Sequence, residues 1–440
     1  MTNLSQYFPQ EHPIVSAIYA AYKQRGDAEP NRGYLGASII GHSCSRYLWY
    51  TFRACCKPEF SGRIYRFFET GDLEETRLVK DLRAIGCTVH DVDEHGNQFA
   101  VNAIGGHFSG HMDVAALGIP TAEKTWHVLE FKTHNAKSFA KLEKEGVQAS
   151  KPQHYAQMQV YMGLTGMTRA LYIAVNKDTD EIYAERVRFD KVAFDALMER
   201  AKRIITSTSP LERISERSDW WECHFCDAYD LCHGPQISAL PISAINCRQC
   251  CHATPEMDGV ARWSCKKHGR SLSEHDQTAA CDDHLVLPGL IGFACPSDYG
   301  KDEHGEYIEF NFTASRDRFL HGRGPGKFTT NELCTLPVSA LTSKLIGAAK
   351  ELFNAEASGY SADDVLSRYP EEDSRIVWEG TVHGLRLAWK KLYSEDLSTL
   401  SPTATSENLD CKAAEFAGGR VAIIWTSSIR QCAEIREGVE

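Results

Sequence analysis

Two acidic residues and a lysine have types and spacing that suit phosphodiester chemistry. Asp113 lies in GHMDVAAL, and Glu130 and Lys132 lie in LEFKT. If these segments form a hairpin that turns inside LGIPTAEK, Asp113 lies directly opposite Glu130. Residues two apart share one face of a strand, so Glu130 and Lys132 point the same way while Phe131 points into the core. The pattern predicts two neighbouring carboxylates with an ammonium group beside them.

Carboxylates that face each other across a sheet repel, and a divalent cation removes that cost. Hard oxygen ligands suit Mg²⁺ or Mn²⁺, which can activate water and neutralise charge on a phosphodiester. Lys132 could orient or deprotonate the attacking water, or stabilise the developing charge. The alternative is a surface hairpin whose Glu130–Lys132 pair is merely solvated. The acid at hairpin distance, the apolar strands and the following helix favour the metal site.

The elements that must position these residues follow from hydrophobic periodicity and end signals. The sequence predicts helices over 12–24, 35–53, 70–86 and 191–205, and a longer helix over 136–165 that is interrupted at Pro152. It predicts strands over 87–92, 108–117, 125–133, 169–177 and 182–189. Strands flanked by helices on this scale indicate a mixed sheet in an α/β domain.

Length and composition set the broad class. A chain of 440 residues with 42% hydrophobic and 24% charged residues is typical of a soluble protein of two or three domains. It has no apolar run long enough for a membrane span and no secretion signal, so we expect a cytoplasmic protein. Its 16 cysteines are then expected to be ligands and buried thiols. The net charge of −11 argues against a generic polyanion binder but leaves room for a local basic groove.

The acidic segments resemble a known nuclease family. GHMD…LEFKT resembles the G-x-x-D…E-x-K core of the PD-(D/E)XK nuclease superfamily, RecB-like branch, with Met112 in place of the proline, which that branch tolerates. FETGDLEETRLVKDL resembles the first helix motif of the family, with its acid on Glu75 and Glu74 as the alternative. HYAQMQVYMGL resembles the last motif, Q-x-x-x-Y, on Gln157 and Tyr161, which share one helix face.

The resemblance implies a restriction-endonuclease-like core, a mixed sheet flanked by helices, and a metal-dependent DNA nuclease. It implies that Glu75, Asp113 and Glu130 bind Mg²⁺ or Mn²⁺ and that Lys132 is catalytic. It also implies that Gln157 and Tyr161 position the DNA. The alternative for Glu75 is a solvated acid at the start of a helix, where the helix dipole favours it. The alternative for Gln157 and Tyr161 is ordinary packing on one helix face.

A cysteine cluster follows the last predicted helix. WWECHFCDAYDLCHG contains Cys223, Cys226 and Cys232 in a C-x₂-C-x₅-C pattern. This spacing, with one cysteine far upstream, resembles an iron–sulfur subgroup of the RecB-like branch that includes the CRISPR-adaptation exonucleases and the AddB nuclease domain. Cys44, in the C-x-R-x-x-x-Y context of GHSCSRYLWY, is the implied fourth ligand.

The implied cofactor is a [4Fe–4S] cluster held by four thiolates. It would join the first helical region to the end of the domain, as a structural staple that closes a long loop. Zinc at the same thiolates is the alternative, because a tetrahedral set of four sulfurs suits either. Cys55 and Cys56 compete with Cys44 for the upstream position but lack its sequence context.

A second cysteine block spans 247–284, after a segment with proline and glycine, 233–243, that we expect to be a linker. Its C-x₂-C start followed by two distant cysteines suggests a small structural zinc site. The four expected ligands are Cys247, Cys250, Cys265 and Cys281, and the residues that could replace any of them are Cys251, His252, His268 and His284. Unligated buried cysteines are the alternative.

These patterns predict a nuclease domain over 1–235, a cysteine-rich module over 244–292 and an α/β C-terminal region over 293–440. The expected function is exonuclease hydrolysis of phosphodiester bonds by metal-activated water. The expected substrate is DNA, at ends or as single strands, in recombination, repair or phage DNA processing, where a recombination or phage protein could be a partner. The alternatives are a site-directed endonuclease and a non-catalytic scaffold that binds nucleic acid.

Overall fold

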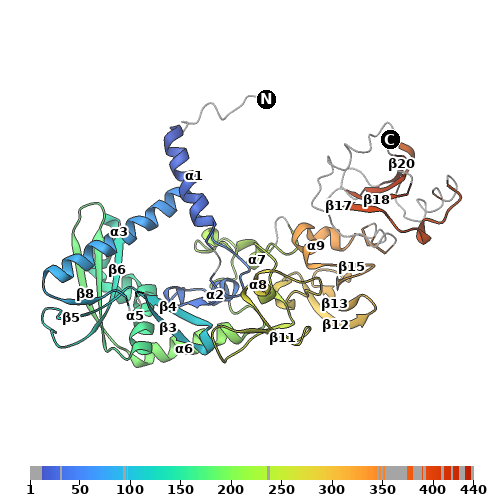
Figure 1. The fold of residues 1–440 in the computed structure, drawn as a ribbon. Coiled ribbons are helices and arrows are strands. Elements are labelled where there is room, and N and C mark those ends of the chain that lie inside the picture. Colours follow the sequence, from blue (N-terminus) through green and yellow to red (C-terminus); the bar gives the residue numbers. More distant parts are fainter. Residues whose placement is uncertain are drawn as a thin grey trace.

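The structure is a computed structural model that describes residues 12–29, 32–92, 96, 98–234, 238–343, 346–347, 350–351, 374–379, 389, 393–407, 411–417, 420–425 and 432–437. The described residues form a mixed α/β protein with several sheets. Figure 1 shows the large sheet and its helices at one end, the cysteine-rich residues in the middle and two further sheets at the other end. None of the helices described is long and apolar enough to cross a membrane.

A five-stranded sheet lies at the centre of the first region. Its strands in spatial order are β2 (Thr88–His90), β5 (Val114–Leu117), β6 (His127–His134), β7 (Arg169–Asn176) and β8 (Ile182–Arg188). The β6–β7 pair is parallel, and the other neighbours are antiparallel. The sheet is therefore mixed, as expected, and strands lie in each of the five places where the sequence predicts them.

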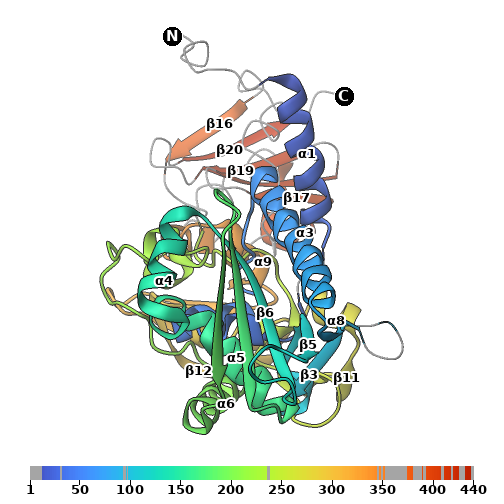
Figure 2. The same ribbon diagram turned by 90° about the vertical axis from the view of Figure 1, so that its left-hand side faces the viewer.

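Helices cover both faces of this sheet (Figure 2): α3 (Gly62–Ala84) covers one, α4 (Ala136–Ser150) and α5 (Pro152–Thr165) cover the other, and α6 (Lys191–Thr206) packs against α5. Leu129 and Phe131 of β6 pack in one apolar cluster with residues of α3 such as Leu78. Val128 lies on the other face, in a separate cluster that includes residues of α4 and α5. The predicted interruption at Pro152 is confirmed, since α4 ends and α5 begins there.

Helix α3 begins earlier than the sequence predicts. We expected a start after Thr70, but α3 begins at Gly62 because its first turns pack against α1 (Pro13–Asp27). The helices touch so closely that a Cβ at Gly62 would lie 1.8 Å from the carbonyl oxygen of Tyr19. Tertiary packing thus extends the helix through Thr70, and its acidic residues lie in the middle of the helix rather than in its first turn.

The predicted helix over 35–53 is also wrong in its first half. The chain forms β1 (Leu35–Gly36) and the 3₁₀ turn η2 (Ala37–Ile39) before α2 (Ser45–Phe52) begins. Strand β1 joins a second sheet in the order β1-β4-β3, with β4 (Phe108–Met112) and the unpredicted β3 (Phe99–Ala103). The expected strand over 108–117 is therefore two strands, and the chain passes from one sheet to the other at Asp113.

The residues after 206 begin with short elements. They are η4 (Cys223–Phe225), α7 (Tyr229–His233), η5 (Cys247–Gln249), β9 (Ala253–Pro255), β10 (Trp263–Cys265), β11 (Arg270–Leu272) and α8 (Glu274–Thr278). The predicted linker is packed where it is described: the amides of Ala239 and Leu240 donate to the carbonyls of Leu336 and Leu333. Residues 235–237 lie outside the described residues.

The cysteine-rich segment, residues 244–292, docks on the predicted nuclease domain. The rings of Phe52 and Trp263 stack at 5.7 Å, and the buried Arg53 guanidinium donates to the Arg248 carbonyl at 3.0 Å. One apolar cluster runs from Leu35 to Ile346. The predicted boundary at 235 and 244 therefore runs through a continuous core.

The C-terminal region is α/β, as expected, where it is described. Its first sheet has the order β12 (Ala294–Asp302), β13 (Gly305–Phe312), β14 (Arg318–Gly322) and β15 (Lys327–Phe328), followed by α9 (Thr330–Thr335) and α10 (Val338–Leu341). Its second sheet has the order β16 (Ser374–Glu379), β20 (Cys432–Glu437), β19 (Arg420–Trp425), β18 (Cys411–Phe416) and β17 (Ala404–Glu407). A 3₁₀ turn, η8 (Leu397–Thr399), precedes β17, and most of residues 352–392 lie outside the described residues.

Candidate active site and metal centres

The hairpin register brings Asp113 and Glu130 together. Strands β5 and β6 pair Val114 with Leu129, and the two following pairs keep this register, so Asp113 and Glu130 form the next pair along. A carboxylate oxygen of Asp113 accepts a hydrogen bond from the Phe131 amide at 3.4 Å. The predicted register is confirmed, and the acidic pair lies at the corner where the chain changes sheets.

Glu130 is completely buried, and only one of its oxygens is paired. Lys132 Nζ forms an ion pair with Oε1, whereas Oε2 has no hydrogen-bond partner in the structure. Burial raises the pKa of Glu130 to about 7; Lys132 opposes that shift and Asp113 adds to it. Phe131 packs on the opposite face, so the predicted alternation along this strand is confirmed. The geometry excludes the solvated surface pair, because Glu130 has no exposure.

Lys132 remains a cation in this setting. Burial lowers its pKa, but the carboxylates of Glu130 and Asp113 outweigh that effect, and the net shift is upward. Its side chain is 29% exposed and lines the same pocket as Asp113. A protonated lysine next to open space can donate hydrogen bonds to an anionic substrate.

Glu75 comes from α3 and lines this acidic pocket, which has a volume of about 390 Å³. Burial raises the pKa of Glu75 to about 7, and the Asp113 carboxylate adds to the shift. The alternative acid, Glu74, also lines the pocket but forms an ion pair with Arg77 at 3.5 Å. Glu75 is the better match to the predicted helix acid, because its charge is coupled to those of Asp113 and Lys132.

Asp72 is a further acidic residue of this pocket that sequence reasoning missed. It lies one turn before Glu75, lines the pocket, and raises the pKa values of both Glu75 and Asp113. The signal was available, since residues three apart share a helix face. It was obscured because the predicted helix start placed Asp72 in a terminal turn, where acids are common.

Gln157 and Tyr161 are buried and connect α5 to the end of β4. Gln157 Nε2 donates to the Tyr161 hydroxyl at 3.3 Å, and that hydroxyl donates to the carbonyl of His111 at 2.7 Å. Burial and the nearby Glu130 raise the pKa of Tyr161. The pair thus fixes the backbone two residues before Asp113, and its burial keeps both side chains from the outer surface.

A histidine–tyrosine group next to Glu130, with His134 and Tyr172 buried and His154 partly exposed, was also missed. Tyr172 is the partner of Glu130 on the parallel strand β7, and its hydroxyl lies 2.9 Å from both His134 Nε2 and His154 Nδ1. Burial lowers the pKa of His134 to about 4 and that of His154 to about 3, and the Lys132 charge contributes to both shifts. Both imidazoles are therefore neutral near pH 7.

The acidic residues are of the type that binds a hard divalent cation, although their side chains do not form a complete coordination site. As the side chains stand, no three His, Cys, Asp or Glu residues in the described ranges are arranged to hold a metal ion. The fit rests on the mutual repulsion of buried carboxylates and on the unpartnered oxygen of Glu130. Ligation by Glu75, Asp113 and Glu130 would require these side chains to move closer together.

The first cysteine set shares one cavity. Cys44 is the N-cap of α2, and it lines a cavity of about 430 Å³ together with Cys223, Cys226 and Cys232. Burial raises the pKa of Cys226 to about 11, and the thiols of Cys232 and Cys44 add to the shift. The structure thus brings the predicted set together, and the cavity greatly exceeds the roughly 30 Å³ that one water molecule takes in the liquid.

The competing upstream cysteines lie elsewhere. Cys55 is fully buried, and Cys56 lines a different pocket, although it is close enough to Cys226 for the charges to interact. A hydrogen bond of 2.8 Å between Ser43 Oγ and Glu222 fixes the chain next to Cys44 against the chain next to Cys223. Cys44 is therefore the upstream cysteine that the fold presents to the other three.

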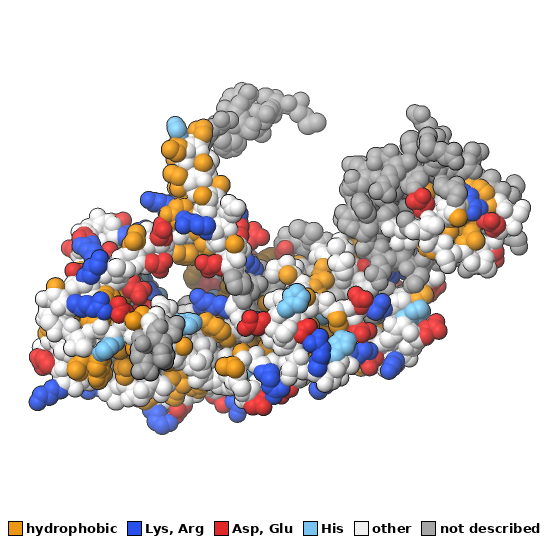
Figure 3. All heavy atoms as spheres, in the orientation of Figure 1, with side chains coloured by type: hydrophobic (Ala, Val, Ile, Leu, Met, Phe, Trp, Pro, Cys, Tyr) orange, Lys and Arg blue, Asp and Glu red, His pale blue; other side chains and the backbone are white. Residues whose placement is uncertain are grey.

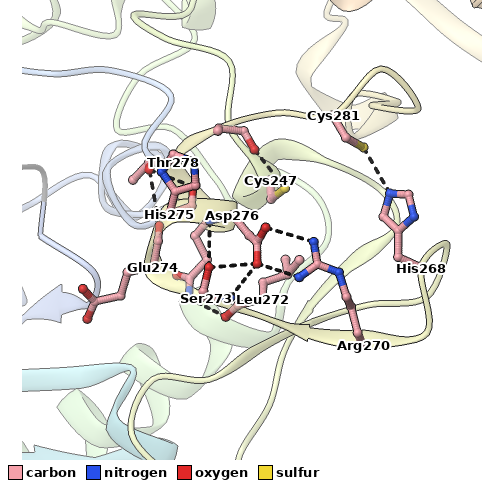
Figure 4. Close-up of polar contacts among 12 residues, drawn as sticks. Cys247, His268, Arg270, Leu272, Ser273, Glu274, His275, Asp276, Thr278 and Cys281 are labelled. Atoms are coloured by element: carbon pink, nitrogen blue, oxygen red, sulfur yellow. Dashed lines mark hydrogen bonds and ion pairs between the residues drawn. The ribbon is translucent and has the colours of Figure 1, made fainter.

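The four cysteines predicted to bind zinc also gather in one place. Burial raises the pKa of Cys247 to about 12, and the thiols of Cys250, Cys281 and Cys265 each contribute. Figure 4 shows Cys247 and Cys281 on two segments that come near each other in space, with the imidazole of His268 directed at the Cys281 sulfur. Nε2 of His268 lies 3.4 Å from that sulfur.

A larger hollow lies beside the acidic pocket, beneath α1 (Figure 3). It has a volume of about 1090 Å³, and Phe68 and Asp72 line both this hollow and the acidic pocket. Its aromatic and basic lining residues include Tyr34, Tyr65, Phe60, Arg25, Arg32 and Lys57. Arg32 of this hollow is also near Tyr161: burial is the main cause of the raised pKa of Tyr161, and the Arg32 charge opposes that shift. The hollow therefore ends close to the candidate metal ligands.

No family model and no curated protein matches this chain. Among solved structures, SSO0001 is 15% identical, with a TM-score of 0.32 over 50% of this chain and 96% of its own. The alkaline exonuclease LHK-Exo of Laribacter hongkongensis, solved with dAMP, is 15% identical, with a TM-score of 0.28 over 43% and 89%. A phage-related exonuclease of Haemophilus somnus 129PT is 17% identical, with a TM-score of 0.24 over 31% and 68%. The chain is distantly similar in structure to these proteins over half of its length or less.

Proposed function

We propose that the chain is a metal-dependent deoxyribonuclease of the PD-(D/E)XK, RecB-like type that degrades DNA from its ends. Its expected setting is recombination, repair or phage DNA processing. The observation that supports this most is that Glu75, Asp113 and a protonated Lys132 line one pocket, with the buried Glu130 directly beside Asp113 and Lys132. Buried acids with raised pKa values are costly to fold around, and such groups concentrate at functional sites.

The residues have distinct roles in hydrolysis. Glu75, Asp113 and Glu130 would hold Mg²⁺ or Mn²⁺, which when bound lowers the pKa of water and offsets phosphodiester charge. Lys132, which stays charged, donates hydrogen bonds to the phosphate oxygens as their charge grows. Water adds to phosphorus in line with the leaving oxygen and loses a proton, the opposite P–O bond breaks, and the leaving oxygen takes up a proton, which gives a phosphate monoester and a hydroxyl. Gln157 and Tyr161 hold the Asp113 corner in place.

The hollow beneath α1 supports a single strand, or a frayed end, as the species that reaches the pocket. Aromatic faces stack on bases of any sequence, at about 1–3 kcal/mol per base, and arginine and lysine neutralise phosphates. Phe68 is 44% exposed and lies where the hollow meets the acidic pocket, so it can stack on the base next to the scissile bond. A local groove of this kind is compatible with a net negative chain.

We also propose a [4Fe–4S] cluster at Cys44, Cys223, Cys226 and Cys232. The support is that all four cysteines line one cavity, in the sequence spacing that resembles the iron–sulfur subgroup. When bound, the cluster would join α2 to the segment that follows α6, as a structural link across a long stretch of chain. Zinc at the same thiolates is the alternative.

End-labelled linear DNA and closed circular DNA, each incubated with Mn²⁺, test the activity. We expect digestion of the linear substrate, intact circles, and loss of digestion in Lys132→Ala. Lys191→Ala is the matched control, because Lys191 is exposed and pairs only with Asp195 on the same helix. Nicked circles would indicate the endonuclease alternative. Equal digestion by wild type and Lys132→Ala would refute the site, and no cleavage of either DNA would favour the scaffold.

Anaerobic purification tests the cluster. We expect a brown protein with about four iron and four sulfide per chain. Cys44→Ala should lose iron, whereas Cys56→Ala should keep it, because Cys56 lines a different pocket. A colourless protein with zinc bound at these cysteines would overturn the cluster and leave the nuclease proposal in place.

A further inference from the structure

The cysteine-rich segment gathers its four cysteines through the backbone. Cys247 and Cys250 lie in one turn, where the Cys250 amide donates to the Cys247 carbonyl at 3.0 Å. Ala253 bonds back to Cys250 and pairs with Cys265 across strands β9 and β10. The Cys247 thiol donates to the carbonyl of Ala279 at 3.6 Å, which places the chain just before Cys281 beside it.

The turn that presents the first two cysteines is held rigidly. Asn246 and Gln249 form a reciprocal capping box around it. Both of their side-chain amides donate to the Ala54 carbonyl, at 3.2 and 2.8 Å, which fixes the turn to the nuclease region. A ligand pair on such a turn is prepared before any ion arrives, so little ordering is left for binding to impose.

The other candidate ligands are occupied or directed elsewhere. Both ring nitrogens of His284 are engaged, with Thr330 Oγ1 at 2.9 Å and the Asn246 carbonyl at 3.0 Å. His252 lies 3.4 Å from Glu306 and lines a separate pocket together with Cys251, whose thiol is hydrogen-bonded to the thiol of Cys250. His268 is thus the remaining competitor for the fourth position.

His268 is in contact with Cys281. Nε2 is 3.4 Å from the sulfur, which suits a hydrogen bond and is also close to the roughly 3.6 Å between nitrogen and sulfur ligands of one tetrahedral zinc. We assign the hydrogen bond because four thiolates already complete a tetrahedral set. An imidazole N–H that donates to a thiolate stabilises the charged sulfur and sets its direction. Asp276, nearby in Figure 4, is fully used by Arg270 and by the amide and hydroxyl of Ser273.

We propose that Cys247, Cys250, Cys265 and Cys281 bind one zinc ion as four thiolates, and that His268 donates a hydrogen bond to Cys281 without ligating. Zinc replaces four thiol protons, and the side chains close by rotation, since the donors are not yet gathered as a metal requires. Cys247 exchanges its bond to Ala279 for the ion. A segment with strands of three residues gains from such a link, because its own apolar core is small.

Alkylation of the native full-length chain tests this without any variant. Cys281 and Cys295 are both exposed, so as free thiols both react quickly. We expect iodoacetamide to label Cys295 and to spare Cys281 until a strong zinc chelator is added, with the sites read by mass spectrometry. Labelling of Cys281 as fast as Cys295 in protein that has not met a chelator would overturn the proposal.

Metal analysis separates this site from the first cysteine set. Cys226→Ser disables the first set and should leave about one zinc per chain, whereas Cys281→Ser should lose it. His268→Ala should keep one zinc at about 10- to 100-fold lower affinity, and its Co²⁺ form should show four-sulfur charge-transfer bands. Zinc that disappears with Cys226→Ser, or a three-sulfur cobalt spectrum in the wild type, would refute the assignment. Neither result bears on DNA cleavage.

Discussion

Binding of Mn²⁺ to the acidic pocket should be strongly dependent on pH. Glu75 and Glu130 both have pKa values of about 7, raised by burial and by the neighbouring Asp113. An acid with a raised pKa stays protonated until the pH passes that value, and a cation binds only the ionised form. Lowering the pH from 8 to 6 therefore makes the cation displace protons, and its affinity falls.

The size of the effect follows from the two values. At pH 6 each carboxyl is about 90% protonated, and at pH 8 about 10%. From these two groups, binding should release about two protons at pH 6 and about 0.2 at pH 8, and Asp113, whose pKa burial also raises, can only add to the release. Each group weakens binding about tenfold over this range, so the pair gives about 100-fold, or about 2.7 kcal/mol. Lys132 adds no proton, since it is charged throughout the range.

Calorimetric titration with Mn²⁺ in buffers of different ionisation enthalpy measures both quantities. Glu130→Gln should release about one proton fewer at pH 6 than the wild type. Glu74→Gln is the matched control, because Glu74 lines the same pocket but is paired with Arg77, and it should behave like the wild type. A wild type that releases less than half a proton at pH 6, or affinities within threefold at pH 6 and 8, would refute the reasoning.

Further predictions concern stability and packing. The metal-free protein should lose stability as the pH rises from about 5 to 7, because the folded form retains a proton on Glu130 that the unfolded form has released. This group contributes about 3 kcal/mol to the free energy of unfolding. Urea unfolding of the wild type and of Glu130→Gln measures the contribution. Tyr161→Phe leaves the His111 carbonyl without its donor and should cost about 1–2 kcal/mol, seen as a lower Tm; an unchanged Tm would contradict the role of this hydroxyl. Gly62→Ala should release α1 to limited proteolysis, because a Cβ there meets a backbone carbonyl of α1 at 1.8 Å. Gly71→Ala, with nothing within 4 Å, should leave α1 protected, and equal proteolysis of the two variants would count against the contact.

The acidic site was largely predictable from sequence because its geometry is local. The Asp113–Glu130 register follows from equal distances to the turn, and the alternation of Glu130, Phe131 and Lys132 follows from strand geometry. The start of α3 was not predictable in this way, because the packing of α1 at Gly62 is a long-range contact. Local signals at Thr70 indicated a helix start that tertiary structure overrides.

The break at Asp113 and the course of the cysteine-rich segment depend on distant partners. The ten-residue segment 108–117 reads as one strand, yet β4 pairs with β3 and β1 while β5 pairs with β6. Likewise, proline and glycine near 233–243 suggested a linker, but the amides of Ala239 and Leu240 find acceptors almost a hundred residues later in the chain. Sequence patterns report local preference and carry no record of such pairings.

The docking of the cysteine-rich segment just before β4 has a consequence for control of the candidate active site. The Ala261 amide donates to the Gly105 carbonyl, and His107 Nε2 lies within hydrogen-bond distance of the carbonyls of Glu256 and Arg262. Strand β4 begins at the next residue and ends immediately before Asp113. An effector that shifts this contact would alter the affinity of the proposed metal site through the five residues of β4. Thermodynamic reciprocity then requires bound metal to alter the affinity for that effector by the same factor.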